Sequence, residues 1–98
     1  MEITSEKNGA EMMIHLSGEL NVMTAEELSQ FLAGELEGVQ DLTFDFAECD
    51  YVSSAGLRVL LSTFKKMKAV GGSMNLDNVG EVFRDVLETT GLDAVFDI

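Results

Sequence analysis

The sequence predicts a small α/β protein with a mixed β-sheet whose helices pack mainly on one face. Stretches with alternating apolar and polar residues are separated by stretches with helical spacing, and glycines rather than prolines stand between them. The predicted order is β-β-α-β-α-β-α-β, and strands joined through helices of this length run parallel. All 98 residues are expected to form one domain, because this length supports a single core.

The first two strands are expected to form a hairpin. Residues 2–7 (EITSEK) and 11–18 (EMMIHLSG) alternate as strands do, and residues 8–10 (NGA) carry the Asn-Gly pair typical of a tight turn. Because strand side chains alternate, His15 is placed on the more open face of the second strand. We interpret it as a partly exposed histidine without a catalytic role, since no carboxylate or hydroxyl close in sequence supplies a partner.

The first helix is predicted to begin at Thr24. The segment TAEE is a capping box, in which the threonine hydroxyl bonds the amide of Glu27 and the Glu27 carboxylate reaches back. Gly38 is expected to end the helix. Its apolar residues with helical spacing are Leu28, Phe31, Leu32 and Leu36.

Three further strands and two further helices complete the prediction. Residues 42–46 (LTFDF) and 73–78 (SMNLDN) are expected to be strands, and residues 94–98 (AVFDI) a final edge strand. The two helices are predicted to end at the glycines Gly71 and Gly91. Their apolar residues with helical spacing are Leu57, Leu60, Leu61, Phe64 and Met67 in the first and Val79, Val82, Phe83, Val86 and Leu87 in the second.

The acidic composition narrows the classes of partner. With 18 acidic residues, 6 basic residues and a net charge of -12, the surface repels nucleic-acid phosphates and anionic lipid headgroups. Residues 1–16 contain no uninterrupted apolar segment, and no later stretch approaches the ~20 apolar residues of a membrane span. We therefore expect a cytoplasmic protein that neither binds nucleic acid nor inserts directly into a membrane.

Four of the six basic residues lie on the predicted second helix. Cations near a helix C-terminus are favoured by the helix dipole, which explains the lysines in the last turns. A basic patch that meets an acidic partner explains the same residues, and the sequence leaves both interpretations open. The four residues are Arg58, Lys65, Lys66 and Lys68.

The chain has one cysteine and one histidine, which excludes an internal disulfide and a zinc site of four Cys and His ligands. Cys49 lies between Glu48 and Asp50, whose charges raise the pKa of a thiol and weaken it as a nucleophile. We expect Cys49 to be a buried structural residue and predict neither a metal nor a cofactor.

Two serines, Ser53 and Ser54, stand where a strand passes into the second helix. Either can be an N-cap, whose removal costs about 1 kcal/mol, or a hydroxyl that is modified. A phosphoryl group at a helix start is stabilised by the free backbone amides, yet it adds about 1.5 to 2 negative charges. It would therefore change a binding surface without unfolding the domain.

An enzyme is not expected. The hydrolase pattern Gly-x-Ser-x-Gly is broken, because Val52 replaces its first glycine, and His15 is the only imidazole available to activate Ser54. Walker-type phosphate loops and Rossmann glycine patterns are absent from the sequence.

Three segments resemble one known family. LSGELNVMTAEEL (16–28), VSSAGLRVLL (52–61) and TTGL (89–92) are similar to the first turn, the second-helix start and the third-helix end of one group of STAS domains. This group is the anti-sigma-factor antagonist branch, which consists of small bacterial regulatory proteins. The likeness spans nearly all of the chain and implies a single STAS-like domain over residues 1–98.

The resemblance implies a phosphorylation site. In the family the second segment is typically Asp-Ser-Ser/Thr-Gly-Leu, and the serine after the aspartate accepts a phosphoryl group from a partner kinase. Alignment on Gly56 places Ser54 at that position. Ser53 and Asn21 then stand where the family commonly has aspartates, and Ala55 replaces the Ser or Thr. We interpret Ser53 as the N-cap.

The family also implies a function. A non-catalytic binding module would capture an anti-sigma factor, usually also an ATP-dependent serine kinase, and so release a sigma factor. Phosphorylation would end the binding, and a PP2C-type phosphatase would restore it. The alternative is a STAS subunit without a phosphoryl switch in a larger assembly, such as a lipid-transport or stress complex. The predicted docking surface consists of Asn21, Thr24, Ser53, Ser54, Ala55, Gly56 and Leu57.

Overall fold

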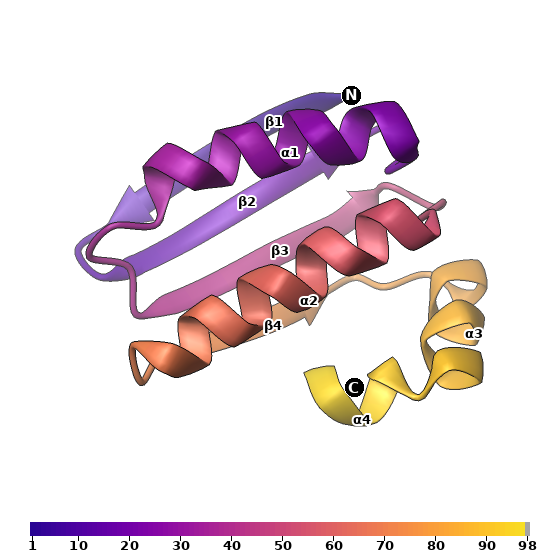
Figure 1. Ribbon diagram of the computed structural model, residues 1–98. Helices are drawn as coiled ribbons and strands as arrows, with labels where there is room; N and C mark the ends of the chain where they lie inside the picture. The colour runs from indigo at the N-terminus through magenta and orange to yellow at the C-terminus, as the bar shows by residue number, and fades with distance from the viewer. Residues whose placement is uncertain (98) are drawn as a thin grey trace.

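The computed structural model describes residues 1–97, which form four strands and four helices (Figure 1). In chain order these are β1 (Glu2–Asn8), β2 (Glu11–Ser17), α1 (Val22–Glu35), β3 (Asp41–Glu48), α2 (Ser54–Ala69), β4 (Ser73–Asp77), α3 (Glu81–Thr90) and α4 (Leu92–Phe96).

The four strands form one mixed sheet in the order β1-β2-β3-β4. β1 and β2 pair antiparallel through the predicted hairpin. β2, β3 and β4 run parallel, because α1 and α2 return the chain to the end of the sheet at which the previous strand began. Both long helices lie on the same face of the sheet (Figure 1). The predicted class, a mixed sheet with helices mainly on one face, is confirmed.

The core lies between this face and the helices. Alternate residues of each inner strand point into it, as the alternation of the sequence predicts. Phe46 at its centre packs edge-on against Phe83 of α3, with 4.7 Å between the ring centroids. The strand residues buried here are Met12, Ile14, Leu16, Leu42, Phe44, Phe46, Met74 and Leu76.

The predicted edge strand at residues 94–98 is wrong, and Ile98 lies outside the described residues. Gly91 adopts a left-handed conformation with φ 78° and ends α3, and the chain then forms the short helix α4. Leu92 and Phe96 are four residues apart, which places both on one side of a helical turn. Phe96 is buried edge-on against Phe64, with 5.6 Å between the ring centroids. This contact explains why the segment is helical.

Two details of the helices also differ from expectation. Val82 was predicted on the buried face of α3, yet its side chain is largely exposed, and Phe83 and Leu87 form that face. α1 ends at Glu35, and Gly38 follows in the turn with φ 81°, a conformation that glycine adopts without strain.

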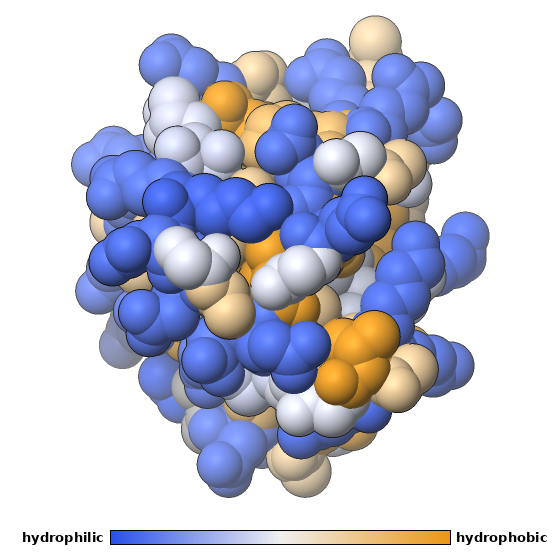
Figure 2. All heavy atoms as spheres, turned by 90° about the vertical axis from the view of Figure 1, so that its left-hand side faces the viewer, coloured by the Kyte–Doolittle hydropathy of each residue, from blue (hydrophilic) through white to orange (hydrophobic). Residues whose placement is uncertain are grey.

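Figure 2 shows the end of the molecule that carries the β1–β2 hairpin and the last turns of α1 and α2. Hydrophilic side chains cover most of this end, and hydrophobic residues show only in small areas between them. In the described part of the chain, no helix has both the length and the apolar composition needed to span a membrane.

Candidate functional site

The candidate site lies at the other end of the molecule, where α1 and α2 both begin after parallel strands. The loops before the two helices are joined by backbone hydrogen bonds. The Leu20 N–H donates to the Tyr51 carbonyl at 2.9 Å, and the Ser53 N–H donates to the Leu20 carbonyl at 2.8 Å. These bonds form a short parallel bridge between Leu20 and Val52. The two motifs singled out in the sequence are therefore side by side.

Ser53 is the N-cap of α2. Its backbone is extended, with φ −88° and ψ 170°, and its hydroxyl accepts a hydrogen bond from the Gly56 N–H at 3.2 Å. This confirms the interpretation of Ser53 as the cap. Ser54 is then the first residue of the helix, and it is exposed.

α1 begins two residues before Thr24, so the predicted Thr24–Glu27 capping box is wrong. Asn21 is the cap, and its Oδ1 accepts from the N–H groups of Met23 and Thr24, both at 3.0 Å. The Thr24 hydroxyl completes the box from the third helical position by accepting from the Asn21 N–H at 2.7 Å. An asparagine caps at least as well as a threonine, which explains the earlier start.

The seven predicted surface residues differ in exposure. Thr24 and Leu57 are each only 9% exposed, and Gly56 is buried. A Cβ on Gly56 would lie 2.7 Å from Leu20 Cγ, so this glycine allows α2 to approach the neighbouring loop closely. Ser54 is exposed, and the half-buried members are Asn21, Ser53 and Ala55.

Three large hydrophobic residues at this end are exposed, and the sequence interpretation did not include them. Val22 is 70% exposed, Met23 is 79% exposed and Tyr51 is 46% exposed. Once Asn21 is recognised as the cap, Val22 and Met23 occupy the first two helical positions. The sequence could have indicated the exposure of Val22 and Met23, because these apolar residues lie outside the buried helical stripe that contains Leu28.

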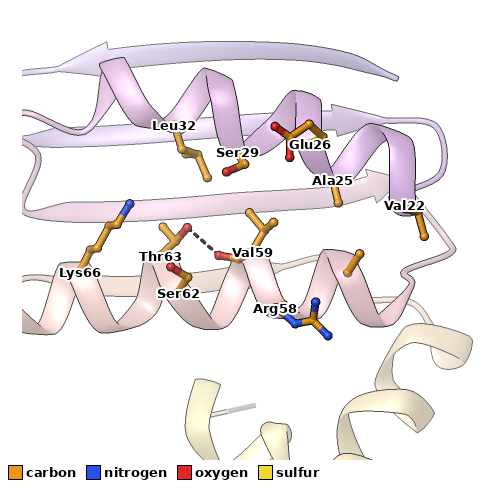
Figure 3. A pocket seen from close by; sticks show the side chains of 11 residues that line it. Val22, Ala25, Glu26, Ser29, Leu32, Arg58, Val59, Ser62, Thr63 and Lys66 are labelled. Atoms are coloured by element: carbon orange, nitrogen blue, oxygen red, sulfur yellow. Dashed lines mark hydrogen bonds between the residues drawn. The ribbon is translucent and has the colours of Figure 1, made fainter.

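A groove of about 390 Å³ runs from this end between α1 and α2 (Figure 3). Thr63 is buried at the floor of the groove, and its hydroxyl donates a hydrogen bond to the Val59 carbonyl at 2.8 Å. The α1 wall contributes one charged residue, Glu26, and the α2 wall contributes two, Arg58 and Lys66. The lining residues are Val22, Ala25, Glu26, Ser29, Leu32, Ala55, Arg58, Val59, Ser62, Thr63 and Lys66.

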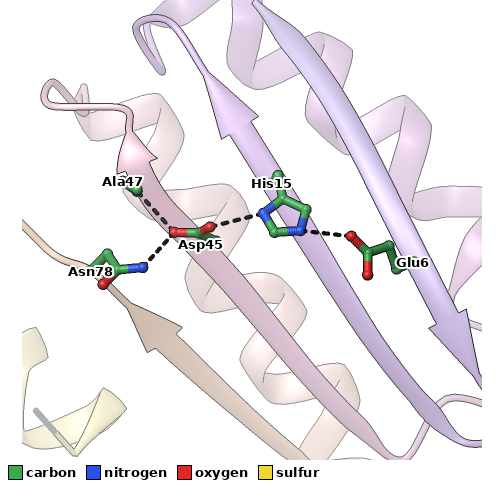
Figure 4. Close-up of polar contacts among 5 residues, drawn as sticks. All are labelled: Glu6, His15, Asp45, Ala47 and Asn78. Carbon is green, nitrogen blue, oxygen red and sulfur yellow. Dashed lines mark hydrogen bonds and ion pairs between the residues drawn. The ribbon is translucent and has the colours of Figure 1, made fainter.

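The open face of the sheet carries a polar network that is separate from the helix starts (Figure 4). His15 Nδ1 lies 2.8 Å from Asp45 Oδ2, and its Nε2 lies 3.3 Å from Glu6 Oε1. Asp45 Oδ1 accepts from the Asn78 side-chain amide at 2.8 Å and from the Ala47 N–H at 3.0 Å. His15 is half-buried on the open face, as predicted. The sequence did not indicate its partners, because they come from neighbouring strands and not from nearby sequence.

Hydrogen bonds in this network shift two pKa values. The bond to Asp45 raises the pKa of His15, and the bond to Glu6 acts in the same direction. The Asn78 amide, then the Ala47 N–H and His15, hold the pKa of Asp45 below its usual value. His15 lies on the face of the sheet opposite the helices, whereas Ser54 begins α2, so the two do not form a catalytic pair.

Cys49 is buried, as predicted. Burial raises the pKa of its thiol, which donates a weak hydrogen bond to the Tyr51 carbonyl at 3.5 Å. A neutral buried thiol is a poor nucleophile and metal ligand. Within residues 1–97, no group of three or more His, Cys, Asp and Glu side chains is placed to hold a metal ion.

Fold and site together define a small α/β domain with paired helix starts at one end. A family model described as "Mlab, STAS domain" matches residues 3–97. The chain is also 31% identical, over its full length and 90% of the relative, to the anti-sigma-B factor antagonist of Bacillus subtilis. The chain therefore belongs to the STAS domain family, among the anti-sigma factor antagonists. These antagonists are binding proteins and not enzymes.

Solved structures show the same fold. The anti-sigma factor antagonist SpoIIAA in its unphosphorylated form superposes with a TM-score of 0.83 at 20% identity, over 99% of this chain and 98% of that one. The Bacillus cell fate determinant SpoIIAA in the phosphorylated form superposes with a TM-score of 0.77 at 22% identity, over 95% of this chain and 86% of that one.

Proposed function

We propose that this chain is a phosphorylation-switched antagonist of an anti-sigma factor that is also a serine kinase. The unmodified protein binds the kinase and so frees a sigma factor. The docking surface is the end of the molecule at which α1 and α2 begin. Its exposed and half-buried members are Asn21, Ser53, Ser54 and Ala55. Its buried members are Thr24, Gly56 and Leu57. The exposed apolar residues of the same end extend it.

Ser54 is the proposed switch because of one observation. It is the exposed first residue of α2, while the cap function belongs to Ser53. The kinase would transfer the γ-phosphoryl group of ATP to Ser54 Oγ. A P–O bond forms to the serine, the bond to the bridging oxygen of ADP breaks, and the hydroxyl proton passes to a base of the kinase. No acidic residue occupies the first turn of α2, so the helix itself does not repel the new charge.

The modification would end binding by charge and not by refolding. A phosphoryl group adds about 1.5 to 2 negative charges to a surface that holds Val22, Met23 and Tyr51. Desolvating that charge against a partner is costly unless the partner supplies cations. A PP2C-type phosphatase would restore the binding form, and we place the cycle in the cytoplasm.

Mass spectrometry tests the proposal directly. After incubation of the full chain with its kinase and ATP, the intact mass should rise by ~80 Da and the group should map to Ser54. Ser54→Ala should abolish the gain. Ser62→Ala, which removes another exposed serine of α2, should leave it unchanged. Modification at Ser53, or none at all, would contradict the proposal.

Binding provides the second test. Ser54→Asp should weaken kinase binding by roughly tenfold or more, because tenfold corresponds to about 1.4 kcal/mol and burying an unpaired carboxylate in an interface costs at least that much. Asn75→Asp is the matched control, since it adds one negative charge on the exposed sheet face at β4. It should bind as the unmodified protein does.

A second candidate function is a STAS subunit of a larger assembly without a phosphoryl switch. It is favoured by the neutral Asn21 and Ser53, whose side chains both serve as helix caps here. That role needs no phosphoryl transfer. Co-purification separates the two functions, because a transporter ATPase as main partner favours the assembly and a GHKL-type kinase favours the switch.

A further inference from the structure

Arg58 stands one helical turn after Ser54. Residues four apart lie on the same face of a helix, separated by about 6 Å along its axis. Arg58 is exposed and lines the groove between α1 and α2. Glu26 lines the opposite wall, yet no ion pair joins it to Arg58. Within residues 1–97, the ion pairs are those of His15 with Glu6 and Asp45. Among these described residues, no side-chain ion pair or hydrogen bond engages the Arg58 guanidinium.

The other basic residues are placed less well to reach Ser54. On α2, Lys65 is the next cation, and it follows three turns later at about 16 Å along the axis. Lys7 lies in β1, where its Nζ donates to the Glu37 carbonyl at 3.3 Å. Arg84 belongs to α3, which lies at the same end of the molecule (Figure 1). Among the basic side chains of residues 1–97, it is therefore the rival that an experiment must separate from Arg58.

We propose that Arg58 is the internal receptor of the phosphoryl group on Ser54. This inference rests on the proposed function and adds its regulation. The guanidinium donates in parallel to two phosphoryl oxygens, a geometry that lysine cannot reproduce. Phosphorylation would then add negative charge at the start of α2 and would hold the Arg58 side chain, one turn further along the same helix, against that charge.

The test uses the full chain with phosphoserine installed at position 54 during translation, so it needs no kinase. The phosphate is titrated by phosphorus NMR. Its second pKa should lie about 0.3 unit lower in the wild type than in Arg58→Ala, the shift expected for one such pair. Arg58→Lys should recover only part of the shift. Lys65→Ala, which removes an equal charge from the same helix, should leave the pKa unchanged.

The thermal midpoints of the phosphorylated and unmodified chains distinguish phosphate binding by Arg58 from a purely structural role. Arg58→Ala should lower the thermal midpoint of the phosphorylated chain more than that of the unmodified chain. Equal phosphate pKa values in the wild type and Arg58→Ala would overturn the proposal. A shift caused by Arg84→Ala instead would assign the receptor to α3 and overturn it as well. Failure of a kinase to modify Ser54 is a separate result, which counts against the proposed function and not against this measurement.

Discussion

The two helix starts at the candidate site are built differently. At α1, the Asn21 side chain accepts from two backbone amides, and the Thr24 hydroxyl both accepts from Asn21 and donates to the Glu19 carbonyl at 2.6 Å. At α2, one hydrogen bond from Gly56 to Ser53 closes the cap, and the next hydroxyl, that of Ser54, is exposed. The comparison shows that the polar side chains of the first helix start are hydrogen-bonded within that start, whereas the second start presents the Ser54 hydroxyl to solvent.

The largest effect is expected where the two starts touch. In Gly56→Ala the new Cβ would lie 2.7 Å from Leu20 Cγ and 2.9 Å from Val52 Cγ2, which forces α2 away from the α1 loop. Overpacking of this kind costs about 1 to 3 kcal/mol of the free energy of unfolding, measured by urea denaturation. Gly34→Ala in α1 meets open space and should stabilise by up to about 1 kcal/mol. A Gly56→Ala protein as stable as the wild type would refute the close approach.

The caps themselves should show the next largest effect. Asn21→Ala loses acceptors for two amides and should cost about 1 to 2 kcal/mol, whereas Ser53→Ala loses one and should cost about 0.5 to 1 kcal/mol. Glu27→Ala should change the free energy of unfolding little, because Asn21 and not Thr24 caps α1 and the Glu27 side chain closes no capping box. If Glu27→Ala proved as costly as Asn21→Ala, the α1 start observed here would be incorrect.

The smallest effect is expected from the His15 network, which lies apart from both helix starts. The pKa of His15 is raised above its ordinary value of 6.5, so its contribution to stability is fully present below that value. The contribution is lost as pH rises through the higher pKa of the folded state. Urea titrations at several pH values should show this loss in the wild type.

His15→Gln supplies the control for that titration. It should remove the pH dependence around neutrality while leaving kinase modification of Ser54 unchanged. If His15→Gln altered that modification, the separation between the sheet face and the helix starts would not hold. Asp45 stays charged in this pH range, because its pKa is lowered.

Much of the fold was predictable because its signals are local. The alternation in residues 42–46 and the left-handed glycines Gly71 and Gly91 depend on side-chain direction and backbone freedom, which neighbouring residues determine. The errors fall where two local signals compete. Asn21 and Thr24 are both good caps, and the apolar residues of the C-terminal segment suit an edge strand as well as a short helix. At the α1 start the local capping bonds of Asn21 decided the outcome, whereas in the C-terminal segment the contact of Phe96 with Phe64 decided it.

The sequence by itself determined the sheet with its helices on one face, the family, and the serine pair at the head of the second helix. These follow from periodicity and from short motifs. Only the tertiary structure decided which groups meet across the chain: the pairing of the two loops, the burial of Leu57 beside the exposed Ser54, and the joining of His15 to Asp45. Side-chain contacts between distant segments depend on how strands pair and helices pack, and no single stretch of sequence contains that information.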